Sequence, residues 1–285
     1  MYQIGWFSSG RDRAARDLLT AIHSAIQDGY IKDAAIRYLF INREYGESPE
    51  SDALIDLAKA YGIEIVFSSH ARFKPADRQK GLAESCTLGC ESPTLRMWRE
   101  SYDREIMERL QKIPVDLNVL AGYMLILSKL TVQAYRIINL HPAPPGGPAG
   151  SWQQVIWALI TERAHNAGCM MHLVAEILDK GPPVTFCTFP IRGPAFDTLW
   201  SDLDARLRTT SMRDIMENGY ETNPLFKAIR QEEAAREIPL LIETVKMFAE
   251  GKLAIRDRVV YAYGRRILGG LPLSDAVERH LKGSK

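Results

Sequence analysis

Cysteine is scarce in this sequence. The 285 residues include four cysteines, Cys86, Cys90, Cys169 and Cys187, which are too few for a disulfide framework to stabilise a chain of this length. Cys86 and Cys90 are separated by three residues in CTLGC and His70 lies upstream, a spacing that permits zinc. Structural zinc sites usually have two close ligand pairs, and the second pair is missing. We therefore predict free thiols and no metal site.

An excess of charge of one sign is also absent. Lys and Arg number 36 against 35 Asp and Glu, so the net charge of +1 provides no field that would hold nucleic acid or an anionic membrane. No apolar run approaches the roughly 20 residues that span a bilayer. The opening MYQIGWFSSG lacks the basic flank, apolar stretch and cleavage site of a signal peptide. We expect a cytoplasmic protein whose partners are small molecules, without nucleic acid or membrane.

Apolar runs alternate with helical patterns through the first half of the chain. Short apolar runs predict strands at residues 2–8, 34–41, 63–69, 117–127 and 136–142. Apolar residues at helical spacing predict helices over 12–26, 51–62 and around 96–112. The segment 70–95 shows neither pattern and is treated as a loop. The alternation predicts an α/β fold with a Rossmann-like, mostly parallel twisted sheet and helices on both faces.

The second half of the chain has a different pattern of strands and helices. Apolar runs at 169–177 and 183–191, joined by the turn-like LDKGPP, predict an added antiparallel pair of strands. After about residue 195 the pattern is helical, with one long helix from Pro224 to Glu250 closed by Gly251. A short strand, VVYAYG, and a terminal helix, SDAVERHLKG, follow. We predict a catalytic domain over 1–195 and a mainly helical extension over 196–285 that packs on it.

Two polar residues stand at the end of a predicted strand. Asn139 lies two residues before the Pro/Gly-rich stretch 141–151, and His141 is the first residue of that stretch. Alternation along a strand puts both side chains on one face. An amide NH₂ and an imidazolium NH aimed at one point stabilise an oxygen that gains negative charge during acyl transfer. The alternative is that Asn139 satisfies loop backbone groups and His141 is an incidental strand-end residue.

A carboxylate follows in the later turn. Asp179 lies in LDKGPP, and a carboxylate beside an imidazole keeps it protonated, orients it and relays a proton through water. An ordinary turn aspartate is the alternative. Spacing alone does not pair Asp179 with His141.

Four motifs together resemble one enzyme family. YDRE (102–105), LAGYMLILS (120–128), INLHP (138–142) and MHLVAEILDKGP (171–182) resemble stretches of the folate-dependent formyltransferases that read approximately YDRE, LAGFMRILS, LNIHP and VHFVTDELDGGP. They occur in the same order at similar separations, and weaker similarity reaches FAEGKL at 248–253. The resemblance is strongest to the glycinamide ribonucleotide branch of that family, which belongs to purine synthesis.

The resemblance implies a reaction. The catalytic residues of the family fall on Asn139, His141 and Asp179. An unprotonated amine of glycinamide ribonucleotide would attack the formyl carbon of the co-substrate 10-formyltetrahydrofolate. Asn139 and protonated His141 would stabilise the tetrahedral oxyanion, and Asp179 would maintain the charge on His141. The implied mechanism uses no metal.

A folate pocket is implied by the same resemblance. The pterin is expected to lie against the strand end at 123–125 and the backbone of 175–179, with the contact residues Tyr123, Met124, Leu125, Ala175, Glu176 and Leu178. Arg99 matches a family arginine near the anionic glutamate tail or phosphate region. A second family arginine is replaced by Leu125, which weakens the expected polyglutamate contact.

The phosphate turn departs from the family. Its Gly-x-Gly-Ser-Asn corresponds here to residues 10–14, GRDRA, where one glycine survives and Asp12 would repel a phosphate held by backbone amides. Gly10, Arg11 and Arg13 are predicted to bind the substrate phosphate, the two arginines through their side chains. The alternative is that both arginines are solvated residues at a helix start.

The sequence also leaves two alternatives for the amine that accepts the formyl group. A family glutamate that holds the ribose hydroxyls aligns with Ala234, and Glu232 and Glu233 lie off register. The acceptor is then glycinamide ribonucleotide bound in an altered way, or another small amine such as an amino sugar. A folate hydrolase of this family would carry an N-terminal regulatory domain, which we do not expect here. A non-catalytic folate-binding relative would need neither His141 nor Asp179.

Three further residues are interpreted as packing residues. His172 matches a family histidine on its strand and is expected to pack or to support the site from behind. Trp152 and Trp157 follow the Pro/Gly-rich stretch at helical spacing, and core packing is favoured over closure of the acceptor site. The oligomeric state stays open between a monomer and a homodimer.

Overall fold

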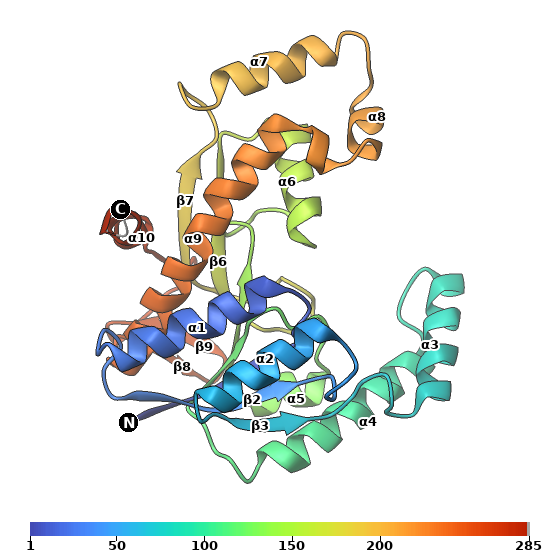
Figure 1. Ribbon diagram of the computed structural model, residues 1–285, viewed down its shortest axis with the longest axis vertical. Coiled ribbons are helices and arrows are strands. Elements are labelled where there is room, and N and C mark those ends of the chain that lie inside the picture. The colour runs from blue at the N-terminus through green and yellow to red at the C-terminus, as the bar shows by residue number, and fades with distance from the viewer. Residues whose placement is uncertain (284–285) are drawn as a thin grey trace. The chain divides into compact units, whose positions relative to one another are not determined.

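The computed structural model describes residues 1–283 and divides the chain into two compact units (Figure 1). Unit 1 comprises 1–139, 173–181 and 249–251, and unit 2 comprises 140–172, 182–248 and the chain from Lys252 onward. Strand β5 (Ile137–His141) runs from one unit into the other. The division into domains at residue 195 stays a prediction.

Unit 1 is built on parallel strands. β1 (Tyr2–Ser8) pairs with β2 (Ala34–Ile41) and with β4 (Leu117–Leu120), β2 pairs with β3 (Glu64–Phe67), and β4 pairs with the start of β5. The order is therefore β3-β2-β1-β4-β5, with every carboxyl end at the same edge. The predicted strands 2–8 and 34–41 are confirmed residue for residue.

Helices cover both faces of these strands. α1 (Arg13–Gln27) and α2 (Pro49–Ala60) lie on one side in Figure 1, and α4 (Pro93–Leu110) lies on the other, next to α5 (Lys129–Ala134). Phe7, Phe40 and Tyr102 belong to the core between the strands and α4. The predicted helices at 12–26, 51–62 and 96–112 are confirmed with ends shifted by a few residues.

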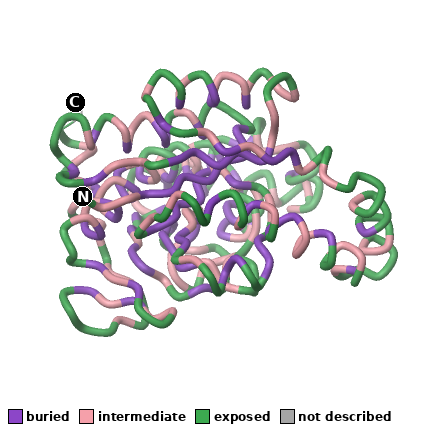
Figure 2. The backbone as a smooth tube through the Cα atoms, turned by 90° about the horizontal axis from the view of Figure 1, so that it is seen from below, coloured by how far each residue is buried: buried purple, intermediate pink, exposed green. Residues whose placement is uncertain are grey.

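The segment 70–95 is not a loop, which corrects the sequence prediction. α3 (Pro75–Leu88) begins with a proline in its first turn and ends at Gly89, whose φ of +67° is left-handed. Gly81 is its one buried residue, and a Cβ there would lie 2.6 Å from the Leu95 backbone nitrogen. In Figure 2, most of this helix is coloured as exposed. Because the helix hides no apolar stripe, its sequence carries no helical periodicity.

The predicted strand 117–127 is also too long. β4 ends at Leu120 because Gly122 has a φ of +69°, which takes the chain out of the extended conformation. Residues 121–128 then form a loop at the carboxyl edge.

Unit 2 carries the antiparallel strands. β6 (Asn166–Leu173) pairs antiparallel with β7 (Pro183–Pro190), as predicted, and β7 pairs with the short β11 (Leu271–Pro272). β8 (Leu253–Arg256), β9 (Val259–Ala262) and β10 (Arg265–Arg266) form a separate small sheet. The central sheet is thus mostly parallel and flanked by helices, which confirms the predicted fold class.

Most helices of unit 2 pack around one core, while α10 (Ser274–Gly283) lies against β7. The helices are α6 (Trp152–Thr161), α7 (Asp197–Arg206), α8 (Met212–Glu217), the 3₁₀ turn η1 (Tyr220–Thr222), α9 (Pro224–Ala249) and α10. Trp157 and Phe226 pack with ring centroids 4.8 Å apart, and Trp152 packs on Tyr220. Core packing is therefore confirmed for both tryptophans. Among residues 1–283, no helix combines the length and the apolarity that crossing a membrane requires.

Candidate active site

The first strand-to-helix turn is closed by a glycine and tied to the 121–128 loop. Gly10 has a φ of +54°, and a Cβ there would lie 2.9 Å from the Ser51 Cα, so a larger residue does not fit. The Ser9 backbone N–H donates to the Gly122 carbonyl at 3.0 Å, and its Oγ accepts from the Met124 N–H at 2.9 Å. The turn and the loop therefore hold one another in place.

Asp12 explains the departure from the family's phosphate turn. It is the N-cap of α1, and its Oδ1 accepts a hydrogen bond from the Ala15 N–H at 3.3 Å. The N-terminus of α1 is thus occupied by a carboxylate of the protein itself. Arg11 is exposed, and Arg13 is exposed and lies 3.6 Å from the Asp17 carboxylate. Phosphate binding by Gly10, Arg11 and Arg13 stays a prediction.

Replacing Asp12 with alanine removes this cap. We expect the variant to lose about 1 kcal/mol of stability, the usual loss for an N-cap change to alanine. Urea unfolding followed by circular dichroism measures the difference. Asp17→Ala, in the same helix but without a cap bond, should change stability by about half that or less. Equal losses in both variants would contradict the capping role.

A buried carboxylate fixes the end of the 121–128 loop. Asp103, 1% exposed, accepts from the Ser128 N–H at 2.5 Å and from the Thr131 hydroxyl at 2.8 Å. Burial raises the pKa of Asp103, and these hydrogen bonds oppose the rise. Asp103 belongs to YDRE and Ser128 to LAGYMLILS, so one contact links two of the four sequence motifs.

Tyr123 differs in role from its neighbours. Its ring is 7% exposed and packs on Phe7 and Phe40, with ring centroids 5.7 and 6.1 Å apart. The side chain therefore belongs to the core, and only the backbone of Tyr123 faces the loop. Met124 is 55% exposed, and Leu125 is half-buried.

The loop at 174–181 is anchored beside α5. The Val174 N–H donates to the Ile137 carbonyl at 2.8 Å, and the Glu176 carboxylate lies 3.2 Å from both Lys129 Nζ and Gln133 Nε2. Large apolar side chains are exposed on this loop, on the 121–128 loop and on α5: Met124, Ile126, Leu130, Ile177 and Leu178. Exposed apolar groups on one functional edge are typical of a ligand surface.

Arg99 carries a charge that is already paired. Its guanidinium forms an ion pair with Glu91, and its side chain is 18% exposed. Its charge also lowers the pKa of Asp103, although burial of that carboxyl has the larger, opposite effect. The role of Arg99 toward a ligand stays a prediction.

The predicted catalytic residues lie at the end of β5 and in the turn between β6 and β7. Asn139 and His141 lie two residues apart on β5, as expected for side chains on one face. Asp179 has a φ of +55° in a turn closed by the Lys180 N–H donating to the Ile177 carbonyl at 3.2 Å. Aspartate tolerates this left-handed conformation better than most residues.

His141 is held within unit 2. It is 3% exposed, and its Nε2 donates to the Pro148 carbonyl at 2.9 Å, since a carbonyl only accepts. The ring of His172 packs edge-on against it, with centroids 6.0 Å apart and planes at 89°. His172 is 2% exposed, so its predicted packing role is confirmed.

The two glutamates near the expected ribose contact are engaged elsewhere. Glu232 Oε2 lies 2.6 Å from Arg236, and Glu233 Oε2 lies 3.1 Å from Arg230. Glu233 is fully buried. Both carboxylates are already paired with arginines of α9.

No cluster of three or more histidine, cysteine or acidic side chains that would hold a metal ion occurs within residues 1–283. Cys86 and Cys90 are exposed, while Cys169 and Cys187 are buried with their sulfurs 3.4 Å apart on β6 and β7.

The sequence profile of the formyl transferase family matches residues 45–213, more than half of the chain. The chain belongs to this family. The matched range contains Arg99, the 121–128 loop, β5 and Asp179, but it begins after the turn at Gly10. The departures at residues 10–14 thus lie outside the part that the profile recognises.

Two relatives of this family member are named phosphoribosylglycinamide formyltransferase. The chain is 27% identical over 233 residues to phosphoribosylglycinamide formyltransferase of Escherichia coli, covering 78% of this chain and 92% of the relative. It is 35% identical over 181 residues to the Schizosaccharomyces pombe enzyme of the same name, covering 61% and 77%.

Solved structures share the fold of this formyl transferase. Phosphoribosylglycinamide formyltransferase from Coxiella burnetii superposes with a TM-score of 0.63 at 19% identity, covering 95% of this chain and 98% of that one. A formyltetrahydrofolate deformylase from Pseudomonas syringae superposes with a TM-score of 0.58 at 17% identity, covering 92% and 66%. At these identities the similarity is one of fold.

Sequence reasoning missed the roles of two residues at the carboxyl edge. Asp12 was read as a charge facing phosphate, not as a helix cap. Asp103 went unnoticed within YDRE, although a buried aspartate always requires partners.

Proposed function

We propose that this formyl transferase moves the formyl group of 10-formyltetrahydrofolate to the amine of glycinamide ribonucleotide. The observation that carries the proposal is the similarity to the E. coli enzyme across nearly all of that enzyme's length. The retained Asn139, His141 and Asp179 support it. We also propose that the protein acts in the cytoplasm on small molecules.

The chemistry follows from two donors on β5. The unprotonated amine attacks the formyl carbon, and the formyl oxygen gains negative charge. The Asn139 amide and the His141 imidazolium donate hydrogen bonds to that oxygen. Nε2–H of His141 donates to the Pro148 carbonyl, which fixes the orientation of the ring. Asp179 maintains the positive charge on the ring.

The folate is proposed to lie against the apolar side chains of unit 1. Met124, Leu125 and Leu178 supply apolar contact, while the backbone at Tyr123, Ala175 and Glu176 supplies hydrogen bonds to the pterin edge. The ion pair of Arg99 with Glu91 must open or extend for Arg99 to reach a carboxylate of the folate tail.

Asp103 is proposed to set the position of this folate surface through Ser128 and Thr131. Asp103→Ala leaves both donors unpaired and should raise the KM for formyl-folate about tenfold, with a smaller change in kcat. Asp103→Asn keeps an oxygen acceptor and should restore KM most of the way. Steady-state kinetics at saturating acceptor separates KM from kcat. An alanine variant with an unchanged KM would refute the positioning role.

A different acceptor amine is the second candidate, and two observations favour it. Asp12 occupies the N-terminus of α1, and Ala234 replaces the glutamate that would hold the ribose. A small amine such as an amino sugar makes fewer demands on those positions.

The acceptor is tested by offering the purified protein 10-formyltetrahydrofolate with a panel of amines. We expect consumption of formyl-folate with glycinamide ribonucleotide and little with amino sugars or glycinamide alone. Faster turnover with an amino sugar would transfer the proposal to the second candidate. Release of formate without any amine would instead indicate a hydrolase.

A further inference from the structure

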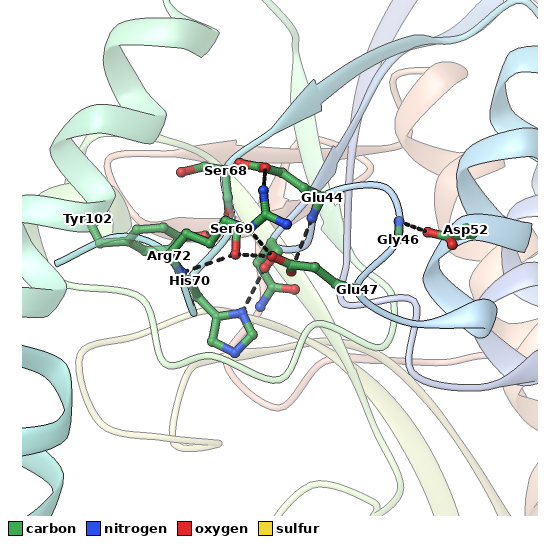
Figure 3. Close-up of polar contacts among 10 residues, drawn as sticks. Glu44, Gly46, Glu47, Asp52, Ser68, Ser69, His70, Arg72 and Tyr102 are labelled. Carbon is green, nitrogen blue, oxygen red and sulfur yellow. Dashed lines mark hydrogen bonds and ion pairs between the residues drawn. The ribbon is translucent and has the colours of Figure 1, made fainter. Parts of the chain in front are cut away.

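The contact between Cys169 and Cys187 can become a covalent bond, unlike the polar contacts between the loops that follow β2 and β3. Those contacts are ion pairs and hydrogen bonds, as where Arg72 lies 2.6 Å from Glu44 and 3.0 Å from Glu47 (Figure 3). Two neighbouring thiols can instead lose two electrons and two protons and form a disulfide. Within unit 2, the Sγ atoms of the two cysteines are 3.4 Å apart.

The strand register brings these thiols together. Cys169 of β6 and Cys187 of β7 are directly opposite partners in the antiparallel pairing. The Cα atoms of such partners are about 4.5–5.5 Å apart, a separation that disulfides span. An S–S bond is about 2.05 Å long, so the sulfurs close from 3.4 Å to that distance while the strands stay paired.

α9 covers the face of β7 on which the thiols lie. Thr185, Cys187 and Phe189 alternate along the strand and therefore share that face. The hydroxyls of Thr185 and Thr244 are 2.6 Å apart, and the Arg236 guanidinium lies 4.5 Å from the centroid of the Phe189 ring. Both cysteines are fully buried, so the pair is shielded from large reagents.

The two thiols are not equivalent. The hydrogen bond from Cys169 lowers the pKa of the Cys187 thiol and the charge of Arg236 lowers it further, while burial raises it. The pKa of Cys169 is raised, first by its hydrogen bond to Cys187 and then by burial. Because the thiolate is the reactive form, Cys187 is the sulfur that attacks first.

We propose that Cys169 and Cys187 form an oxidation site at which hydrogen peroxide produces a disulfide between β6 and β7. The Cys187 thiolate attacks one peroxide oxygen, the O–O bond breaks, and a sulfenic acid forms as hydroxide leaves and takes up the thiol proton to become water. The Cys169 sulfur then attacks the sulfenic sulfur, the S–O bond breaks, and a second water leaves with the Cys169 proton. The two thiols lose two electrons in total, and one peroxide molecule gains them.

Peroxide can reach a buried pair. It is neutral and close to water in size, so local opening of the strands is sufficient to admit it. Thiol reductants reverse the bond by exchange. None of these steps requires formyl transfer.

The bond closes a ring around the loop that carries Asp179. The ring runs from Cys169 to Cys187 and contains His172 and the 174–181 loop. Oxidation should therefore restrict the hairpin of β6 and β7 and raise the temperature at which the protein unfolds.

Peptide mapping after peroxide treatment tests the site. The protein used carries Cys86→Ser and Cys90→Ser, which removes the two exposed thiols and leaves the buried pair. Circular dichroism confirms that it is folded. Its mass should fall by two hydrogen atoms on oxidation, and the oxidised chain should run as a monomer on a denaturing gel.

Trypsin separates the two cysteines. It cuts after Arg163, Lys180 and Arg192, so one cysteine lies on peptide 164–180 and the other on peptide 181–192. In digests of the oxidised protein these two peptides should stay linked until a reductant is added.

Two single variants assign the roles of the sulfurs. In Cys169→Ser the sulfenic acid on Cys187 has no thiol to resolve it, and dimedone, which traps sulfenic acids, should label it. Cys187→Ser is the matched variant at the opposite position and should be labelled about tenfold less. Equal labelling of the two variants rejects the assigned order of attack.

Linked peptides from the folded protein, with an unfolding temperature about 5 °C above that of the reduced protein, support the site. Peptides that stay unlinked at a peroxide concentration that oxidises Cys86 and Cys90 of the wild type reject it. A link that forms only in urea, or only between two chains, also rejects it, because the fold then does not bring the thiols together. A lower unfolding temperature after oxidation shows that the paired strands do not accommodate the bond, and it likewise overturns the proposal.

Discussion

His141→Ala is expected to lower kcat about 10³-fold while leaving the affinity for folate within about threefold of the wild type. The ring supplies a charged hydrogen-bond donor to an oxyanion that exists only after the amine attacks, so its loss affects the transition state rather than substrate binding. Stopped-flow measurement of formyl loss gives kcat, and fluorescence titration with a non-reactive folate gives the affinity.

A histidine elsewhere in unit 2 provides the control for this prediction. His165→Ala changes an exposed side chain, while the His165 backbone carbonyl keeps its hydrogen bond from the Ile191 N–H at 2.9 Å. This variant should turn over at the wild-type rate. A His141→Ala enzyme that keeps more than about a tenth of the wild-type kcat would contradict the role given to the imidazolium.

The variant Asp179→Asn removes the carboxylate charge and keeps the backbone conformation of the turn. Asparagine tolerates the left-handed φ of +55° as well as aspartate does, so the turn should persist. Removing the carboxylate should lower kcat about 100-fold, because the imidazolium loses the negative charge that favours it in the transition state. Stopped-flow measurement of formyl loss gives kcat, and a rate close to that of the wild type argues against the role.

The second large effect concerns stability, and it comes from Glu233 in α9. This carboxyl is fully buried, and its Oε1 has no hydrogen-bond partner. Burial raises its pKa to about 8, repulsion from Glu237 adds to the rise, and Arg230 opposes it. The folded protein therefore binds this proton more tightly than the unfolded chain, in which the pKa is about 4.5.

The sign of the pH dependence follows from these two pKa values. The stability contributed by the protonated Glu233 is fully present below pH 4.5 and is lost as the pH rises through 8. Glu233→Gln keeps a neutral group in the same space. Its stability relative to the wild type should therefore rise from pH 6 to pH 9, by about 1.4 kcal/mol for each unit of raised pKa that is expressed.

Thermal unfolding across this pH range measures the difference. Glu232→Gln is the matched control, because Glu232 is the adjacent carboxylate and its side chain is 46% exposed. Its unfolding temperature should follow that of the wild type at every pH. If the curves of Glu233→Gln and the wild type run parallel, Glu233 is ionised throughout and the stability argument fails.

Local pattern was sufficient to predict most strands and helices. β1 and β2 were predicted to the residue because each is a short, largely apolar run that is followed by polar residues. α3 was missed because Gly81 is its one buried residue, and a helix that packs through a glycine leaves no apolar stripe. β4 was predicted too long because apolar residues continue past Gly122, where the backbone turns.

The candidate site divides in the same way. Asn139 and His141 were proposed because they are two residues apart at the end of one predicted strand, and Asp179 was assigned to them through the family resemblance; all three roles stay predictions. Asp103 and its partner Ser128 are 25 residues apart, so spacing gives no sign of the contact.

Transfer of a labelled formyl group tests the central claim most directly. The protein is mixed with 10-formyltetrahydrofolate carrying ¹³C in the formyl group and with glycinamide ribonucleotide, and the products are separated by mass spectrometry. The account predicts that the label appears on the amine of the ribonucleotide as one tetrahydrofolate is released per label transferred. Label that stays on the folate, or that leaves as free formate, would contradict it.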